Sequence, residues 1–420
     1  MAKRLYALVK PKLLTWARES ASFSVEQVAE SLHLKADRII RWEMGDEKPT
    51  IPQLRKLADL YHRPIAVFYL PEKPKDFQPL HDFRRIRTQV ESQPRNYKIQ
   101  LQIRQAHYRR DIAIELTNEL QGELPTLKYE ISLIDNPEEI GKRIRDILNI
   151  SYENQLKASN PNVMFKVWRT ALENAGVLVF QVKGIPVEDM RGFSISEYPL
   201  PVIVINSRDS SSGKVFTLLH EFAHIMLHKS GMCDLDESNE RKKEDNDFEV
   251  FCNHIAGATL LPKEILLSEE LVTTEVGKVK ANANGFRNIE WTNEQLTYLA
   301  QKKFKVSREV VLRRLLTFNM TSLRHYQVMR DEFNRQAKEF NERKEEPDEE
   351  AGEKKKRFAP PAKIVLSNVS LPFVRLVLES YHQQIITARD LSDYLDVRLK
   401  QLPKIELEII SRTTSSGSVI

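Results

Sequence analysis

Apolar residues near the start of the chain recur at the spacing of short helices. In residues 24–33 they fall on one face, and Ser24 followed by Gln27 is the sequence pattern of a helix capping box. A second helical stretch, residues 35–45, ends at a glycine, and a third, residues 52–61, has proline in its first turn. Two short helices joined by a tight turn and followed by a supporting helix indicate a helix-turn-helix.

The middle of the chain predicts both helices and strands. After a proline-rich linker, residues 93–121 have the pattern of one long amphipathic helix, which we interpret as a spacer or scaffold, and residues 137–175 are also helical. The glycine-bounded apolar run 175–184 predicts a buried strand. Residues 190–206 predict two more strands, the last from Pro201 to Asn206, whose edge we expect to be able to pair with an extended substrate.

The C-terminal third predicts only helices. Residues 292–322 contain two amphipathic helices split near Val306. Their turn resembles a further helix-turn-helix, but we expect these helices to pack onto the preceding domain. Residues 327–357 are dense in charges and predict a solvated helix or linker, and residues 371–405 a small helical unit.

Composition indicates a soluble protein of two or three domains. The chain has 420 residues, of which 41% are hydrophobic and 29% charged. It contains no apolar run near the roughly 20 residues that cross a bilayer and no signal-peptide pattern, so a cytoplasmic location is expected. Two cysteines, Cys233 and Cys252, cannot form a disulfide framework, which agrees with a reducing compartment.

The surplus of positive charge is concentrated in the N-terminal residues. Residues 1–75 hold 14 Lys and Arg against 9 Asp and Glu, a surplus of +5 that equals that of the whole chain. The surplus is compatible with an anionic partner and equally with a solvated basic surface.

The strongest chemical signal lies in the apolar stretch 214–228, where His220, Glu221 and His224 form a His-Glu-x-x-His motif. Residues four apart on a helix lie on one face about 6 Å apart, so both imidazoles can bind one zinc ion. Glu221 points beside the metal, where it can act as general base toward water. The alternative is a core helix, which would have to supply buried partners for three polar side chains.

A catalytic zinc site usually takes a third protein ligand. His228 lies eight residues beyond His220, about 12 Å along a helix, and is too distant. Glu249 opens an apolar helix that stops before Pro262, and would complete a two-histidine, one-carboxylate site. Cys252 is the rival ligand, and His254 is turned away on that helix.

The N-terminal segment resembles the helix-turn-helix of phage-type (XRE-type) repressors. The positions that match its pattern are Ala29, Trp42, Glu43, Gly45, Pro49 and Thr50. The resemblance implies that the helix Lys35–Glu43 is a recognition helix with Ile39 and Trp42 in the core. Its exposed candidates for DNA contact are Lys35, Asp37, Arg38 and Arg41. The alternative is a domain that lost DNA binding and docks a protein.

Residues 170–320 resemble the ImmA/IrrE family of metallopeptidases. In these, a His-Glu-x-x-His helix precedes a helix of the form E-x-x-x-N-x-x-A-x-x-x-L-x-P, matched here by Glu249, Asn253, Ala256, Leu260 and Pro262. The resemblance favours Glu249 over His228 and Cys252 as the third ligand. It also implies one catalytic zinc ion, and cleavage of a DNA-bound repressor or an antitoxin; no motif names the substrate.

We therefore predict a multidomain, mainly α protein with an all-α helix-turn-helix domain and an α+β, zincin-like metallopeptidase domain. The predicted ranges are 1–74 for the helix-turn-helix domain, 75–165 for a helical linker or scaffold, 166–320 for the peptidase, 321–362 for a charged helical linker and 363–420 for a small C-terminal helical unit.

The predicted function is that of a DNA-binding zinc endopeptidase that regulates transcription by cleaving a repressor or antitoxin. Its expected partners are double-stranded DNA and a protein substrate, with no membrane, and a homodimer is an open alternative. A second hypothesis is a regulator whose peptidase-like half is a non-catalytic sensor or dimerisation scaffold. A third is one member of a toxin–antitoxin gene pair.

Overall fold

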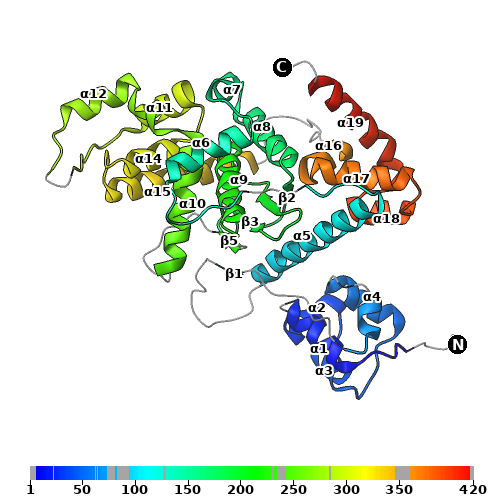
Figure 1. Ribbon diagram of the computed structural model, residues 1–420. Coiled ribbons are helices and arrows are strands. Elements are labelled where there is room, and N and C mark those ends of the chain that lie inside the picture. The colour runs from blue at the N-terminus through cyan, green and yellow to red at the C-terminus, as the bar shows by residue number, and fades with distance from the viewer. Residues whose placement is uncertain are drawn as a thin grey trace, which may run out of the picture. The chain divides into compact units, whose positions relative to one another are not determined.

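Two separate hydrophobic cores organise the chain. The computed structural model describes residues 6–21, 23–61, 63, 65–72, 81–82, 94–125, 129–228, 231–233, 243–282, 285–345 and 360–416. The first unit contains residues up to His81 together with residues 85–108, and the second contains residues 82–84 and 109–420. Figure 1 labels the elements of both units.

The part of the first unit up to Tyr69 is helical, as predicted, apart from an isolated β-bridge between Tyr6 and Thr50. Its elements are α1 (Pro11–Ser20), α2 (Val25–Leu32), α3 (Ala36–Met44), α4 (Ile51–Leu60) and the 3-10 helix η1 (Ile65–Tyr69). The predicted capping box forms at the start of α2: Ser24 Oγ accepts from the Gln27 N–H at 3.2 Å, and Gln27 Oε1 accepts from the Ser24 N–H at 2.8 Å. Helix α1, which packs on α3, was not predicted, although its first residue is a proline.

The turn after α3 depends on a glycine. Gly45 has φ 88°, in the left-handed region, and a Cβ there would lie 2.9 Å from Pro11 Cγ. Ile39 and Trp42 are each 1% exposed, so their predicted core positions are confirmed.

The second unit contains most of the helices. Helix α5 (Pro94–Glu119) enters it at Arg109. The helices that follow are α6 (Pro137–Ile147), α7 (Tyr152–Lys157), α8 (Pro161–Asn174), α9 (Ser211–Met226), α10 (Lys243–Leu260), α11 (Lys263–Leu267), α12 (Glu270–Lys278), α13 (Asn293–Tyr298), the π-helical η2 (Leu299–Phe304), α14 (Arg308–Thr317), α15 (Leu323–Glu345), α16 (Pro361–Asn368), α17 (Leu371–His382), α18 (Ala388–Leu395), the 3-10 helix η3 (Leu399–Gln401) and α19 (Leu402–Ser416).

A mixed sheet crosses this unit, with four strands in the order β5-β3-β4-β2. These strands are β2 (Leu178–Val182), β3 (Gly192–Ile195), β4 (Val202–Asn206) and β5 (Gly231–Cys233). The two-residue strand β1 (His81–Asp82) falls at the boundary between the two units. Strand β4 pairs in parallel with β2 and antiparallel with β3, which itself pairs antiparallel with β5. The strands predicted at 175–184 and 190–206 are confirmed.

The prediction that the strand Pro201–Asn206 could pair with a substrate is wrong. Its residues Val202 to Asn206 form β4, and both edges of β4 are already hydrogen-bonded, one to β2 and the other to β3. No edge of this strand is open to an added strand.

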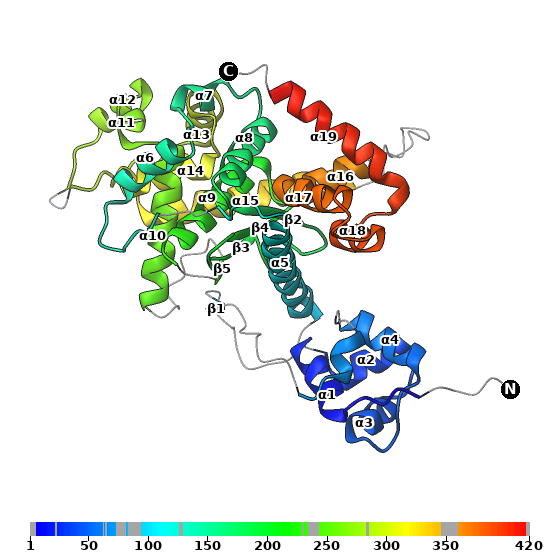
Figure 2. The same ribbon diagram turned by 45° about the vertical axis from the view of Figure 1, so that its right-hand side comes forward.

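Helix α9 lies at the centre of the second core. It packs on β3 and β4 and beside α8 and α10 (Figure 2). Every residue from Val215 to Met226 is buried. Helix α10 is in turn approached closely by α6 at Gly141, where a Cβ would lie 2.8 Å from the Thr259 backbone nitrogen. The packing around α9 therefore comes from segments widely separated in the sequence.

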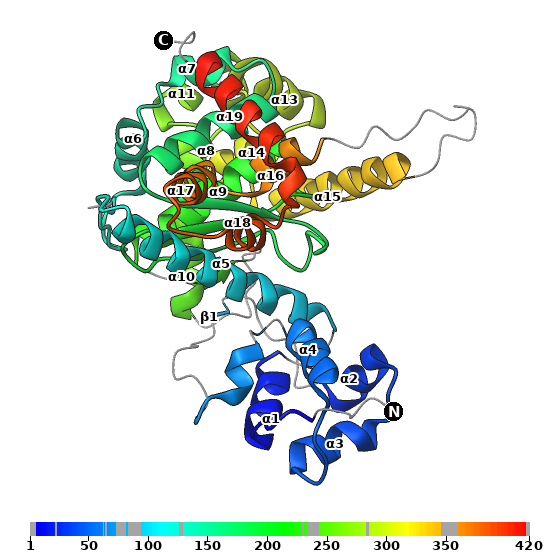
Figure 3. The ribbon, with the colours of Figure 1, turned by 90° about the vertical axis from the view of Figure 1, so that its right-hand side faces the viewer.

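The C-terminal helices are hydrogen-bonded to helix α8 of the second unit. Arg169 on α8 donates to the carbonyl oxygens of Ser367 and Val369 at 2.6 and 2.7 Å, and Glu173 Oε1 accepts from Ser370 Oγ at 2.9 Å. Figure 3 shows α16 to α19, coloured orange to red, grouped together. At the other end of this unit, Ile140 lies in the same core as α9, although it falls in the predicted linker range 75–165. The predicted domain boundaries otherwise remain predictions.

Candidate metal centre

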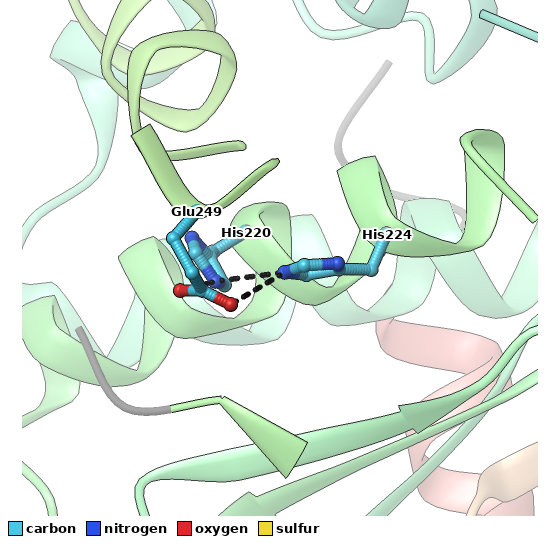
Figure 4. A group of neighbouring side chains, drawn as sticks. All are labelled: His220, His224 and Glu249. Atoms are coloured by element: carbon cyan, nitrogen blue, oxygen red, sulfur yellow. Dashed lines mark hydrogen bonds and ion pairs between the residues drawn. The ribbon is translucent and has the colours of Figure 1, made fainter. Parts of the chain in front are cut away.

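Three side chains converge from two neighbouring helices. Helix α9 begins at the cap residue Ser210, whose Oγ accepts from the Gly213 N–H at 3.0 Å, and carries His220 and His224 one turn apart on one face. Helix α10 brings Glu249 to the same point, and Figure 4 shows the three side chains directed toward one another. All three are 0% exposed.

The donor atoms have the separations of a metal site. The two Nε2 atoms of His220 and His224 are 3.2 Å apart, and each lies 3.4 Å from an oxygen of Glu249. Ligands about 2.0–2.1 Å from a tetrahedral zinc ion are about 3.3 Å from one another, so these separations are compatible with three residues that share one zinc ion. Among the described residues this is the group of histidine, cysteine and acidic side chains that could hold a metal ion.

The surroundings favour neutral histidine and ionised glutamate. Burial lowers the pKa of His220 and outweighs the opposing effect of Glu249, and the charge of Arg313 lowers that pKa further. Burial alone would raise the pKa of Glu249, but its hydrogen bonds to His220 and His224 lower it overall. Neutral imidazole and ionised carboxylate are the forms that bind a metal.

Strand β3 passes close to Glu221, which follows His220 on α9. Glu221 is 0% exposed. Gly192 begins β3, and a Cβ placed on it would lie 2.7 Å from Thr217 Cγ2, 3.0 Å from the Val204 carbonyl oxygen and 3.4 Å from Glu221 Oε1. A residue larger than glycine at position 192 would therefore force β3 and α9 farther apart. Gly192 was not among the predicted site residues, although a glycine that opens an apolar strand signals close backbone approach.

The other candidate ligands lie outside the cluster. His228, two residues past the end of α9, has a side chain 42% exposed and pairs with Glu130 at 3.2 Å, so its exclusion is confirmed. His254 is turned away, as predicted, and contacts Glu138 at 2.6 Å. Cys252 is buried beside His224 but is not part of the converging group, and burial raises the pKa of its thiol.

A hollow adjoins the metal-binding face of α9. It is small, and Arg191, Phe216 and Arg313 are among the residues that line it. Phe216 stacks on the His220 ring with centroids 6.3 Å apart, and the Arg313 guanidinium lies 5.6 Å from the Phe216 ring centroid. Arg313 comes from α14, so no local sequence signal connects it with the motif on α9.

The predicted DNA-contacting residues lie on the exposed side of α3 in the first unit. Lys35 is the N-cap of α3, and Asp37, Arg38 and Arg41 follow within its first two turns. Arg41 forms ion pairs with Asp37 and, at 3.0 Å, with Glu47. The negative charge of Asp37 is therefore partly neutralised by a neighbour on its own helix.

These observations define a class: a helix-turn-helix protein with a metallopeptidase-like domain. Residues 14–68 match the helix-turn-helix family model, and residues 172–316 match the model of the IrrE N-terminal-like domain, an M78 peptidase family. The two matches have the architecture of an ImmA/IrrE-type domain preceded by an XRE-type helix-turn-helix, so the resemblance seen in the sequence is confirmed. No curated protein matches the chain. Within the described parts of the chain, no helix is long and apolar enough to span a membrane.

Proposed function

We propose that this protein is a DNA-binding, zinc-dependent endopeptidase that controls transcription by cleaving a repressor or an antitoxin. The observation that carries the proposal is the buried group of His220, His224 and Glu249, whose donor atoms are 3.2 to 3.4 Å apart. The family match over residues 172–316 supports the peptidase class. The helix-turn-helix match over residues 14–68 supports the DNA-binding role.

In this proposal the chain's own residues divide the chemistry between them. His220, His224 and Glu249 would hold the metal ion through two imidazole nitrogens and one carboxylate. Bound zinc supplies Lewis-acid activation of water and of the scissile carbonyl. The Glu221 carboxylate accepts a proton from the attacking water and passes it to the nitrogen of the leaving amine.

Lys35, Asp37, Arg38 and Arg41 are proposed to contact DNA through the exposed side of α3. Such contacts would place the peptidase near a repressor on the same DNA. A peptidase delivered in this way needs little affinity of its own for the substrate, because tethering raises the local concentration.

The test compares three variants of the full chain with wild type. We expect Glu221→Gln to keep one zinc per chain and to lose cleavage by about a thousandfold or more, because the base is removed and the ligands remain. His220→Ala should lose both zinc and cleavage. His228→Ala is the matched control and should retain both, since His228 pairs with Glu130 away from the cluster.

Zinc is measured by elemental analysis, and cleavage by mass spectrometry with the repressor-like or toxin–antitoxin proteins of adjacent genes as substrates. Wild-type protein purified without zinc would contradict the proposal. If Glu221→Gln regulated transcription in cells as well as wild type, the non-catalytic sensor would be the better description.

A further inference from the structure

The helix-turn-helix of the first unit has a characteristic turn. Helix α2 begins at a capping box on Ser24 and ends at His33, a left-handed residue with φ 54° and ψ 45°. The next residue, Leu34, donates its N–H to the Ala29 carbonyl at 2.8 Å. Lys35 then begins α3 as an extended N-cap with φ −81° and ψ 141°.

A turn with the same backbone pattern recurs between α18 and η3, the 3-10 helix that continues into α19. Helix α18 begins at a capping box on Thr387 and ends at Asp396, with φ 53° and ψ 51°. Val397 donates to the Ser392 carbonyl at 3.0 Å, and Arg398 is an extended N-cap with φ −81° and ψ 137°. Each of these residues has a counterpart in the first unit. The two members of every pair are separated by the same number of positions along the chain as Ser24 and Thr387.

The pattern of burial follows the same register. Val28 and its counterpart Leu391 are both 0% exposed, and Trp42 and its counterpart Ile405 are 1% and 0% exposed. On the outer side, Met44 is 71% exposed and its counterpart Leu407 is 67% exposed. The helix that begins at η3 and continues as α19 therefore presents the same side to solvent as α3 does.

The exposed side of this second helix is more basic than that of α3. Arg398, Lys400 and Lys404 are exposed and stand where α3 has Lys35, Asp37 and Arg41. On α3, Arg41 is engaged by two carboxylates. Among the described residues, no ion pair of Arg398, Lys400 or Lys404 is found, so these three cations are open to an anionic partner.

A third turn in the chain shows that this backbone pattern alone does not make a DNA-binding helix-turn-helix. Between η2 and α14, Lys305 is left-handed with φ 55° and Ser307 is the N-cap of α14. Residues 310–315 of α14 are all buried in the core of the second unit, so this helix cannot enter a DNA groove. The prediction that these helices pack onto the peptidase is confirmed.

We propose that residues 387–407 form a second DNA-binding helix-turn-helix, which contacts duplex phosphates through Arg398, Lys400 and Lys404. A helix presented by such a turn fits the major groove of B-form DNA, and unpaired cations along it gain affinity by releasing counterions from the phosphates. The site lies outside both matched ranges, 14–68 and 172–316. It is also independent of metal binding and cleavage.

The experiment measures the affinity of the full chain for a random-sequence DNA duplex three helical turns long, over a series of salt concentrations. Because α3 is also expected to bind DNA, the measurements are made in a background that carries Lys35→Ala, Arg38→Ala and Arg41→Ala. To this background we add Arg398→Ala, Lys400→Ala and Lys404→Ala. Each phosphate contact contributes about 0.9 to the slope of log K against log salt, so the slope should fall by up to about 2.7 and the affinity by about tenfold or more.

Two controls separate a binding surface from net charge and from misfolding. Lys142→Ala, Lys157→Ala and Lys166→Ala remove the same charge from exposed positions elsewhere in the second unit and should leave the slope unchanged. The charge-preserving exchanges Arg398→Lys, Lys400→Arg and Lys404→Arg should retain binding. An unchanged slope after the three C-terminal alanine substitutions would overturn the proposal, as would an equal loss in the Lys142, Lys157 and Lys166 variant. Neither result would bear on zinc content or cleavage.

Discussion

The two units place their candidate functional residues in opposite environments. On α3, the side chains of Asp37, Arg38 and Arg41 are 64%, 45% and 49% exposed. In the second unit, His220, Glu221, His224 and Glu249 are all 0% exposed. A surface that binds phosphates must stay solvated until its partner arrives, whereas a metal centre benefits from a buried, fixed donor set.

The difference predicts how each unit responds to substitution. Removing one polar group from a buried cluster leaves the others without their partner, and this costs both stability and chemistry. Removing one exposed cation changes binding and its salt dependence, with little effect on folding.

Glu249→Gln should lose the metal, because the amide replaces the charged ligand that lies 3.4 Å from each histidine nitrogen. We expect zinc affinity to fall by more than the roughly 100-fold that loss of an outer-shell partner costs. Competition with a chromogenic chelator measures this. Cys252→Ser is the matched control on the same helix and should keep zinc; loss of zinc from the serine variant would make Cys252 a ligand after all.

Glu138→Gln should destabilise the second unit by about 2–3 kcal/mol. This loss is smaller than that expected when a fully buried ion pair is broken, because Glu138 is partly exposed. Glu138 accepts two hydrogen bonds at 2.7 Å from Arg314, whose side chain is only 1% exposed. Denaturant unfolding at neutral pH measures the loss, with the exposed Glu123→Gln as control.

The pH dependence of that loss has a defined sign. Burial raises the pKa of Glu138, but its hydrogen bonds to His254 and Arg314 lower it to about 2. The stabilisation is therefore present above the unfolded-state pKa near 4.5 and is lost as pH falls toward 2. The difference between wild type and Glu138→Gln should shrink over this range; a constant difference would show that the ion pair is not its source.

Gly192→Ala should lower cleavage about 10- to 100-fold while zinc stays bound, because a small shift of β3 from α9 displaces Glu221. The added Cβ would meet Thr217 Cγ2 at 2.7 Å. Gly277→Ala on α12, with no atom within 4 Å of its Cβ, is the control and should be neutral or stabilising. Full activity in the Gly192 variant would mean that Glu221 does not depend on this contact.

Arg38→Ala should have the smallest effect. Arg38 is half exposed, so stability should change by no more than about 0.5 kcal/mol, while the salt slope of DNA binding falls by about 0.9. By contrast, Trp42→Ala, four residues along the same helix, removes a side chain 1% exposed and should cost about 3–5 kcal/mol. Thermal unfolding and DNA titration of the two variants would show whether binding and folding are separable in this unit.

Local patterns predicted much of the architecture and the centre of the site. Capping residues and helical periodicity predicted α2, α3 and α4, and apolar runs predicted β2 to β4, because these signals act within a few residues. The candidate metal ligands on α9 and the choice of Glu249 as the third candidate also came from sequence. The order of strands did not, since pairing depends on residues far apart, and so β4 was wrongly expected to have an open edge.

The sequence by itself determined the components of this protein: a helix-turn-helix with its exposed cations, a helix with His220, Glu221 and His224 in one register, and a second helix with Glu249. Helical geometry fixes these relations within a single element. Tertiary structure alone decided that the nitrogens of His220 and His224 and the carboxylate of Glu249 lie 3.2 to 3.4 Å apart, and that Gly192 lies close to Glu221. It also decided that, of the helices that follow the three similar turns, α14 is the buried one. Those relations arise from packing between distant segments, and burial against a neighbour is a property that no single segment carries.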